Sequence, residues 1–279
     1  MPELPEAEVV AQQLRARLLG AQLQEIWVGR ADIVREGLPT VSWYRGVRLQ
    51  SVDRYGKSVA MGFQHEGVCR YVVAELGMTG LLLFPSAQAK YPQHVHAKLF
   101  FEEAQEPELR YWNPRRFGRL SLLDRAGLDR YIARRFGLDP LSMSLPDFVQ
   151  VLRGRRGRLK SLLMHQQVIA GIGNIYANEI LFRVGLHPHV QVSRLSVNRV
   201  EQLYRTMREV LNEAITHGGS SVRDFFAPDG TEGRYKWRHL VYGKTGQRCS
   251  NHCGGIIRRF QSERSDFFCP RCQSLRSAK

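Results

Sequence analysis

The spacing of hydrophobic residues changes twice along the chain. Near the N-terminus, Val10, Leu14 and Leu18 recur every fourth residue, which predicts an amphipathic helix over residues 5–19 that ends at Gly20. From residue 21 to about residue 123, short β-rich runs alternate with Gly, Pro and Asp, which is typical of a β-sandwich or barrel. The strands are predicted at residues 24–28, 47–52, 58–63, 68–74, 80–84, 96–101 and 118–123.

Helical spacing returns at residue 128. Segment 227–236 (APDGTEGRYK) offers few core residues and is predicted to be a mobile loop. The predicted fold class is multidomain α+β, with a β-sandwich and its leading helix over 1–127, a helical domain over 128–236 and a C-terminal segment over 237–279. Helices are predicted at residues 128–136, 145–153, 159–166, 175–183 and 195–217.

Basic residues strongly outnumber acidic ones. The chain has 41 Lys+Arg against 26 Asp+Glu, a net charge of +15 and a pI near 10.1. Such an excess predicts a polyanionic partner, most simply nucleic acid, although a ribosome-like particle or an anionic membrane would fit the same charge. The longest apolar runs, such as residues 81–84, are far too short to span a membrane, and no apolar signal region precedes them. We therefore expect a cytoplasmic protein.

Four of the five cysteines lie near the C-terminus as two close pairs, Cys249 with Cys253 and Cys269 with Cys272. This spacing is typical of a ribbon around one tetrahedral zinc ion, whereas disulfides are disfavoured in a reducing cytosol. His252 stands at the more usual two-residue spacing and is an alternative to Cys253. We expect four sulfur ligands, which leave no position open for water, so the zinc would be structural.

The first residues, MPELPE, hold a candidate nucleophile. Removal of Met1 would expose the secondary amine of Pro2, and a terminal amine has a reference pKa of about 7.7–8.0, against about 10.4 for lysine. Such an amine can attack a masked aldehyde to form an iminium, and Glu3 and Glu6 stand beside it to move protons. The same residues also suit a helix start, because proline fits the first turn and carboxylates face the positive end of the dipole.

A glycine-rich turn, GIGNIY over residues 171–176, precedes one predicted helix. Its backbone N–H groups suit a phosphate, and Asn174 is placed where an N-cap residue would be. The basic residues Arg155 and Lys160 precede it and favour a phosphate partner. An ordinary joint between helices and a solvated basic face are the alternatives.

Two further motifs give only weak evidence of function when each is taken alone. In the segment 113–118 (NPRRFG), Arg115 and Phe117 suit insertion into stacked bases, although such a sequence is also common in surface loops. Lys57, at the start of an apolar strand, could hold a phosphate or donate a proton, or it could protect a sheet edge.

Together, the motifs resemble the formamidopyrimidine-DNA glycosylase family, bacterial base-excision repair enzymes with a helix–two-turn–helix domain. The similarity runs collinearly over residues 2–273. Its landmarks are PELPE at 2–6, LGMTG at 76–80, NPRRFG at 113–118, GIGNIYANE at 171–179, VYG at 241–243 and the terminal cysteine pairs. The resemblance implies a monomeric, nucleoid-associated glycosylase/AP lyase that acts on duplex DNA with oxidised purines or abasic sites.

The resemblance also implies roles for the catalytic residues. Pro2 matches the nucleophile that forms a Schiff base at sugar C1, Glu3 the acid that assists base loss, and Glu6 a residue of the lesion pocket. Lys57 matches the lysine that assists β-elimination. Arg264, in the hairpin expected between the cysteine pairs, matches the arginine assigned to δ-elimination.

Other matching residues are implied to hold DNA. Met78, Arg115 and Phe117 match the side chains that fill the gap left by the flipped nucleotide. Segment 220–236 matches the loop that covers the extruded base. The remaining DNA contacts implied in this way are His94, Arg155 and Asn174, and Lys160 is expected to contact DNA as part of the basic run.

Two features depart from the family pattern. Glu75 stands where many members carry histidine, and the first cysteine pair has three-residue spacing. Leu4 favours the purine-specific branch over endonuclease VIII, which usually has glycine there. An endonuclease VIII-like enzyme for oxidised pyrimidines, and a catalytically silent zinc-ribbon DNA-binding protein, are the alternatives.

Overall fold

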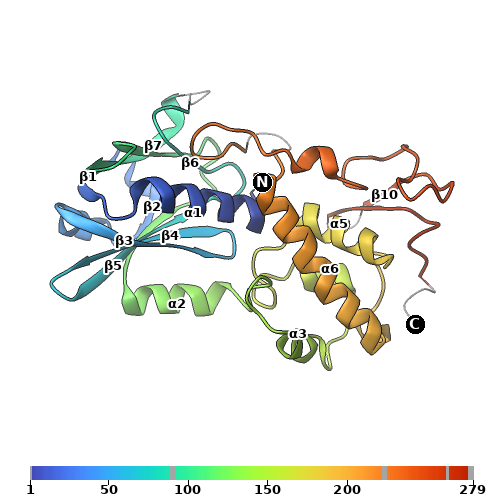
Figure 1. The fold of residues 1–279 in the computed structure, drawn as a ribbon. Coiled ribbons are helices and arrows are strands. Elements are labelled where there is room, and N and C mark those ends of the chain that lie inside the picture. Colours follow the sequence, from blue (N-terminus) through green and yellow to red (C-terminus); the bar gives the residue numbers. More distant parts are fainter. Residues whose placement is uncertain (1, 88–91, 222–224, 262–263, 276–279) are drawn as a thin grey trace. The chain divides into compact units, whose positions relative to one another are not determined.

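The computed structural model describes residues 2–87, 92–221, 225–261 and 264–275 (Figure 1). Contacts divide the chain into two compact units. The first comprises Met1–Arg135 and Ile215–Lys236, and the second comprises Phe136–Ala214 and Trp237–Lys279. Segment 215–236 therefore belongs with the β-rich part, although it follows the helices in the sequence.

The first unit begins with α1 (Leu4–Leu18), close to the predicted helix. Pro5 occupies the first turn, and Arg15 and Arg17 lie in the last, where cations suit the helix dipole. Along one face, spaced by three or four residues, Ala7, Val10, Ala11, Leu14 and Leu18 are fully buried against the sheet.

Among the described residues of this unit, nine strands form one sheet in the order β2-β9-β5-β4-β3-β1-β7-β8-β6. Its halves are joined where β1 pairs with β3 at Gln22↔Arg48 and Leu23↔Val47, and both strands carry a bulge beside this junction. Bulges bend strands, so the sheet can fold over on itself. The strands are β1 (Gln22–Val28), β2 (Val34–Glu36), β3 (Val47–Tyr55), β4 (Ser58–His65), β5 (Val68–Glu75), β6 (Leu81–Leu83), β7 (Val95–Glu102), β8 (Glu108–Trp112) and β9 (Leu120–Asp124).

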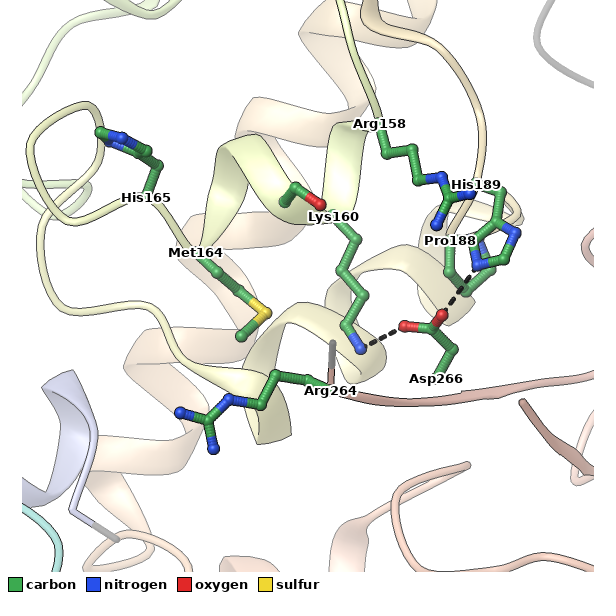
Figure 2. Close-up of a pocket in the computed structure, with 9 residues that line it drawn as sticks. Arg158, Lys160, Met164, His165, Pro188, His189, Arg264 and Asp266 are labelled. Atoms are coloured by element: carbon green, nitrogen blue, oxygen red, sulfur yellow. Dashed lines mark hydrogen bonds and ion pairs between the residues drawn. The ribbon is translucent and has the colours of Figure 1, made fainter. Parts of the chain in front are cut away.

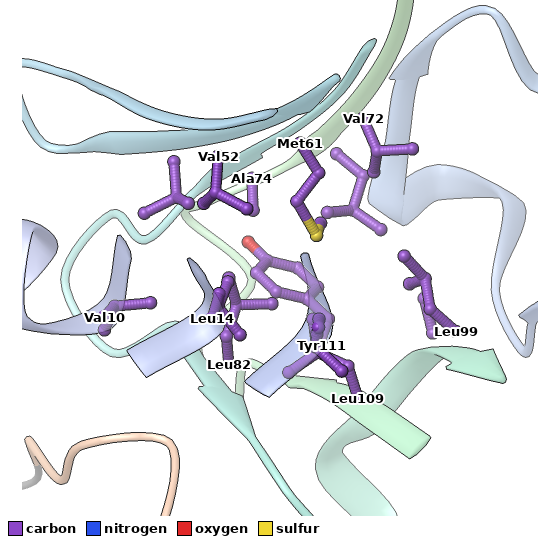
Figure 3. Packing of buried hydrophobic residues seen from close by; sticks show 14 of the residues in the cluster. Val10, Leu14, Val52, Met61, Val72, Ala74, Leu82, Leu99, Leu109 and Tyr111 are labelled. Carbon is purple, nitrogen blue, oxygen red and sulfur yellow. The ribbon is translucent and has the colours of Figure 1, made fainter. Parts of the chain in front are cut away.

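One hydrophobic core lies between the halves of the sheet. Met61 and Val72 come from one half, and Leu109 and Tyr111 come from the other (Figure 3). The predicted sandwich with a leading helix is therefore confirmed, with hydrogen bonds continuous from one layer to the other. The sequence pattern missed β2 and β8, which are short. Helix α2 (Arg125–Arg135) packs on β5 and β9.

The expectation of a mobile loop at 227–236 is wrong for the part that closes against α1. Gln13 and Asp229 exchange two hydrogen bonds, of 3.0 and 3.1 Å, and Arg17 lies 3.3 Å from the Asp229 carboxylate. Phe84 N donates to Pro228 O at 2.7 Å. These polar contacts therefore hold the segment together with its buried residues Ala227 and Tyr235. The expected lesion-covering loop lies partly outside the described residues, at 222–224.

The second unit is mainly helical, as predicted, and ends in a hairpin. Its helices are α3 (Leu145–Leu152), α4 (Leu159–Leu163), α5 (Asn174–Val184) and α6 (Val197–Thr216), and its strands are β10 (Arg258–Gln261) and β11 (Ser265–Phe268). Helix α4 is shorter than predicted because Gln166 bonds the carbonyls of Met164 and Ile172, both at 2.8 Å, and turns the chain. Within the described residues, no helix has both the length and the apolar surface that membrane crossing requires.

Candidate functional site

The start of α1 brings the predicted acidic residues together. Pro2 and Glu3 are buried, and Glu6 is 1% exposed. One carboxylate oxygen of Glu6 accepts a hydrogen bond from Glu3 N at 2.7 Å, and the other accepts one from Ser220 N at 2.6 Å. A Cβ at position 219 would lie 2.8 Å from the same carboxylate, so glycine is needed there. Glu6 therefore links the backbone beside Pro2 to segment 215–236, and its expected place in a lesion pocket stays a prediction.

Lys57 lies at the tip of a tight hairpin. Tyr55 and Ser58 are paired across β3 and β4, which leaves Gly56 and Lys57 as the connection. Gly56 has a φ of +56°, which suits glycine in a two-residue hairpin. Because β4 lies between β3 and β5, the alternative that Lys57 protects a sheet edge does not apply. A half-buried lysine is thus presented on a well-defined turn.

The loops that carry Met78 and Phe117 pack backbone against backbone. A Cβ at Gly77 would lie 2.6 Å from Gly118 N, and one at Gly118 would lie 2.0 Å from Glu75 O. Asn113 Nδ2 donates to Gly118 O at 3.2 Å, which closes the second loop. The two loops therefore form one packed surface, the loop platform, which carries two of the residues predicted to fill the gap left by a flipped nucleotide.

Exposed side chains complete this platform. Phe117 is 55% exposed, and the Arg115 guanidinium lies 4.7 Å from its ring centre. A cation over an exposed aromatic ring suits contact with nucleobases, which have both π faces and polar edges. His94 adjoins it, because its carbonyl accepts a hydrogen bond from Asn113 N at 2.9 Å.

Glu75 forms a buried charge cluster that the sequence did not reveal. Its Oε1 lies 3.1 Å from Arg35 Nη1 and 3.1 Å from Arg135 Nη2. Burial raises the pKa of Glu75, while Arg35 opposes that effect. Tyr111 also donates its hydroxyl to the Glu75 carbonyl at 2.6 Å. Glu75, which stands where many family members carry histidine, is thus paired with two arginines just before the loop that carries Met78.

In the second unit, the glycine-rich turn leads directly into α5. Gly171, with a φ of +90°, donates its N–H to Gln166 Oε1 at 2.9 Å. The N-cap is Gly173, so the expectation that Asn174 is the N-cap is wrong; Asn174 is the first helical residue. Its side chain is half-buried, and Asn178 Nδ2 contacts its Oδ1 at 3.3 Å. The turn keeps the geometry of an anion site at a helix N-terminus.

The basic run before this turn divides into exposed and buried members. Arg155 is exposed, whereas Lys160 is 5% exposed and its ammonium lies 2.5 Å from Asp266 Oδ1. His189 Nε2 lies 2.8 Å from the other oxygen of Asp266. The structure therefore uses Lys160 inside the unit, where it joins α4 to β11.

A cavity of about 660 Å³ opens beside this pair (Figure 2). Arg158, His165 and Arg264 contribute to its lining, and the Arg264 guanidinium extends away from the Lys160–Asp266 pair (Figure 2). A pocket with this excess of cationic groups suits an anion such as a phosphate.

The four C-terminal cysteines converge. The Sγ atoms of Cys249, Cys253, Cys269 and Cys272 all lie within 4.8 Å of one another, and His252 does not belong to the group. The geometry thus favours Cys253 over His252. The Gly255 N–H is the main cause that lowers the pKa of Cys253, to about 7, whereas burial raises the pKa of Cys249 and that of Cys272. Four close sulfurs beneath a β-hairpin suit one tetrahedral metal ion.

Glu179 is a further buried anchor that the spacing did not single out. Its carboxylate accepts hydrogen bonds from the backbone N–H groups of Leu240, Val241 and Tyr242 at 2.8, 3.1 and 2.8 Å. Burial raises the pKa of Glu179, against the opposing effect of these donors. One carboxylate of α5 therefore fixes the VYG segment.

Comparison with known protein families defines the class of protein. The family description "Formamidopyrimidine-DNA glycosylase N-terminal domain" matches residues 1–120, and "Formamidopyrimidine-DNA glycosylase H2TH domain" matches residues 136–226. A β-rich N-terminal domain, a helical H2TH domain and a four-cysteine hairpin are the parts of a DNA glycosylase of this type.

Individual relatives match this chain over almost its whole length. A formamidopyrimidine-DNA glycosylase of Solibacter usitatus is 38% identical over 275 residues, which cover 98% of this chain and 99% of the relative. The Lactococcus lactis Fpg in complex with DNA containing an abasic site has a TM-score of 0.86 at 28% identity, and the match covers 98% of this chain and 99% of that one. MutM in complex with DNA containing carbocyclic 8-oxo-G has a TM-score of 0.84 at 29% identity, covering 98% and 100%. The chain belongs to the formamidopyrimidine-DNA glycosylase family, and it is an enzyme.

Proposed function

We propose that the protein excises oxidised purines, 8-oxoguanine and formamidopyrimidines, from duplex DNA and then cleaves the strand. The observation that carries this proposal is the order at the start of α1, where Pro2 and Glu3 are buried and the Glu6 carboxylate binds the backbone N–H of Glu3. The related proteins solved with abasic-site and 8-oxo-G DNA support the choice of substrate. We also propose that the enzyme acts as a monomer in the cytoplasm, on the nucleoid.

In the proposed chemistry, the Pro2 amine attacks C1 of the lesion sugar and the C1–base bond breaks. Glu3 supplies the proton that assists ring opening and base loss. The resulting iminium draws electrons from the sugar, so the proton on C2 becomes acidic and its removal expels the 3′ phosphate. Lys57 assists this β-elimination, and Arg264 the δ-elimination that releases the second phosphate.

The remaining residues are proposed to extrude the base and to hold the DNA. Flipping a base costs a few kcal/mol, which Met78, Arg115 and Phe117 offset in part by filling the vacated space. Asn174, Arg155, His94 and the net charge of +15 supply phosphate contacts.

The cysteine cluster is proposed to bind one structural zinc ion, because its four sulfurs suit tetrahedral coordination. The ion would stabilise the hairpin that carries Arg264. It would take no part in the reaction.

Borohydride trapping on a duplex with an abasic site tests the mechanism. We expect a covalent adduct with the wild-type protein and none with Pro2→Gly. An active preparation with Met1 fully retained, as measured by mass spectrometry, would contradict the proposal. No adduct at all, together with retained DNA affinity, would leave a DNA-binding protein without catalysis.

The substrate class needs a separate measurement. Excision from matched duplexes with 8-oxoguanine or thymine glycol should favour 8-oxoguanine. A preference for thymine glycol would instead indicate an endonuclease VIII-like enzyme.

A further inference from the structure

We propose that Arg54 is a positioning residue for Lys57 and that it acts together with Glu8 of α1. The inference rests on the proposed function, in which Lys57 assists strand cleavage after Pro2 has formed the Schiff base. It concerns a partly buried ion pair to which neither the family resemblance nor the sequence motifs assign a role.

The geometry links two elements that each carry a proposed catalytic group. Arg54 lies in β3, and its side chain is only 6% exposed. Its Nε lies 2.9 Å from Glu8 Oε2, and its Nη1 donates to Gly56 O at 3.2 Å. Glu8 belongs to the helix that starts beside Pro2, and the Gly56 carbonyl belongs to the peptide that leads into Lys57. One guanidinium therefore ties the turn of Lys57 to the helix of the nucleophile.

Glu8 is held from its other side as well. Arg15 Nη1 lies 3.3 Å from Glu8 Oε1, and Arg15 Nε donates to Val52 O at 2.6 Å. The carboxylate thus lies between two arginines, both of which also bond backbone carbonyls of the β3–β4 hairpin. This arrangement needs the several N–H donors of a guanidinium, because a lysine ammonium on its longer, flexible stem does not match the same fork geometry.

The position of the turn decides where the Lys57 ammonium can act. Four flexible methylenes separate its ammonium from the backbone, so its reach is set by where the turn places its Cα. A displacement of about 1 Å in a catalytic group can cost about 100-fold in rate. If the Arg54–Gly56 bond is lost, the turn is free to move relative to α1, while Pro2 stays in place at the start of the helix.

The two chemical steps can be measured separately on one abasic duplex. Borohydride trapping reports Schiff-base formation by Pro2, and strand cleavage without borohydride reports elimination. For Arg54→Met we expect trapping within about twofold of wild type and strand cleavage slowed about 10- to 100-fold. Arg54→Lys keeps the charge opposite Glu8 but not the fork, so its cleavage should be intermediate.

Arg48→Met is the matched control. Arg48 lies on the same strand and pairs with Glu103 at 2.6 Å, but its side chain is 48% exposed. Both rates should stay at the wild-type level. Equal losses of trapping and cleavage in Arg54→Met would overturn the proposal, because a general structural defect would do the same.

A double-variant cycle with Lys57→Ala decides whether Arg54 acts through Lys57. Arg54→Met should slow cleavage much less in the Lys57→Ala background than in the wild type. Additive losses would refute the proposal. If Arg54→Met does not fold, Arg54→Lys and Glu8→Gln complete the same cycle. A wild-type protein that gives no adduct would refute the proposed function itself, which is a different result.

Discussion

The Lys160–Asp266 pair allows a stability prediction worked from burial. Lys160 is 5% exposed and Asp266 is 2% exposed, and their charged atoms lie 2.5 Å apart. The ammonium also donates to Ser265 O at 2.9 Å. Asp266→Asn keeps the shape of the side chain and removes its charge, which leaves a buried ammonium without its counter-charge.

Removing one partner of a buried ion pair costs about 3–5 kcal/mol. Because the asparagine oxygen can still accept a hydrogen bond from Lys160, we expect a loss of about 3 kcal/mol, the low end of that range.

Urea unfolding followed by hydrogen exchange in peptides from α4 and β11 measures the effect on this unit. The control is Glu201→Gln on α6, which removes a solvent-exposed pair with Arg205 and should change stability by less than about 1 kcal/mol. The reasoning is refuted if Asp266→Asn costs no more than Glu201→Gln.

Three further outcomes are expected. Burial lowers the pKa of His239 to about 4, so the folded state resists protonation, and acidification from about pH 6.5 to pH 4 should remove about 3 kcal/mol of stability. His239→Gln should flatten that part of the pH–stability curve, and an unchanged slope would contradict the assignment. Cys269→Ser should lose the metal and weaken DNA binding while hydrogen exchange in β4 and β5 is unchanged; full affinity without metal would exclude a role for the hairpin in holding DNA. Asn174→Ala should weaken binding to damaged and intact duplexes alike and leave the salt slope unchanged, because a neutral amide releases no counterions, and a loss confined to one lesion would show that Asn174 is not a general phosphate contact.

Local signals were enough to predict most elements of the fold. The four-residue spacing of Val10, Leu14 and Leu18 predicted α1, because a helix with one apolar stripe must bury it. The cysteine spacing predicted the hairpin and its cluster, because four sulfurs around one ion tolerate few arrangements. β2 (VRE) and β8 (ELRYW) were missed, since each is short and carries two charged residues, whereas the equally short β6 (LLL) is an apolar run.

Contacts between residues far apart in the sequence could not be predicted from these local signals. Segment 227–236 looked mobile because it is polar, yet Asp229 is bound by Gln13, 216 residues away in the sequence. Lys160 was expected to contact DNA together with the other basic residues before the glycine-rich turn, whereas in the structure it is buried and paired with Asp266. A polar residue in a sequence does not reveal whether its partner will be water or another side chain.

The sequence by itself determined which chemical groups this protein has: a proline beside two glutamates, a lysine at the start of an apolar strand and two cysteine pairs. These lie within short segments, and local rules of backbone geometry and ligand spacing apply to them directly. Only the tertiary structure decided how charges such as Glu6, Arg54, Glu75 and Glu179 are used. Each is shielded from water by segments that are distant in the sequence. A charge shielded from water is costly unless it is paired, and only the fold decides which partner lies within reach.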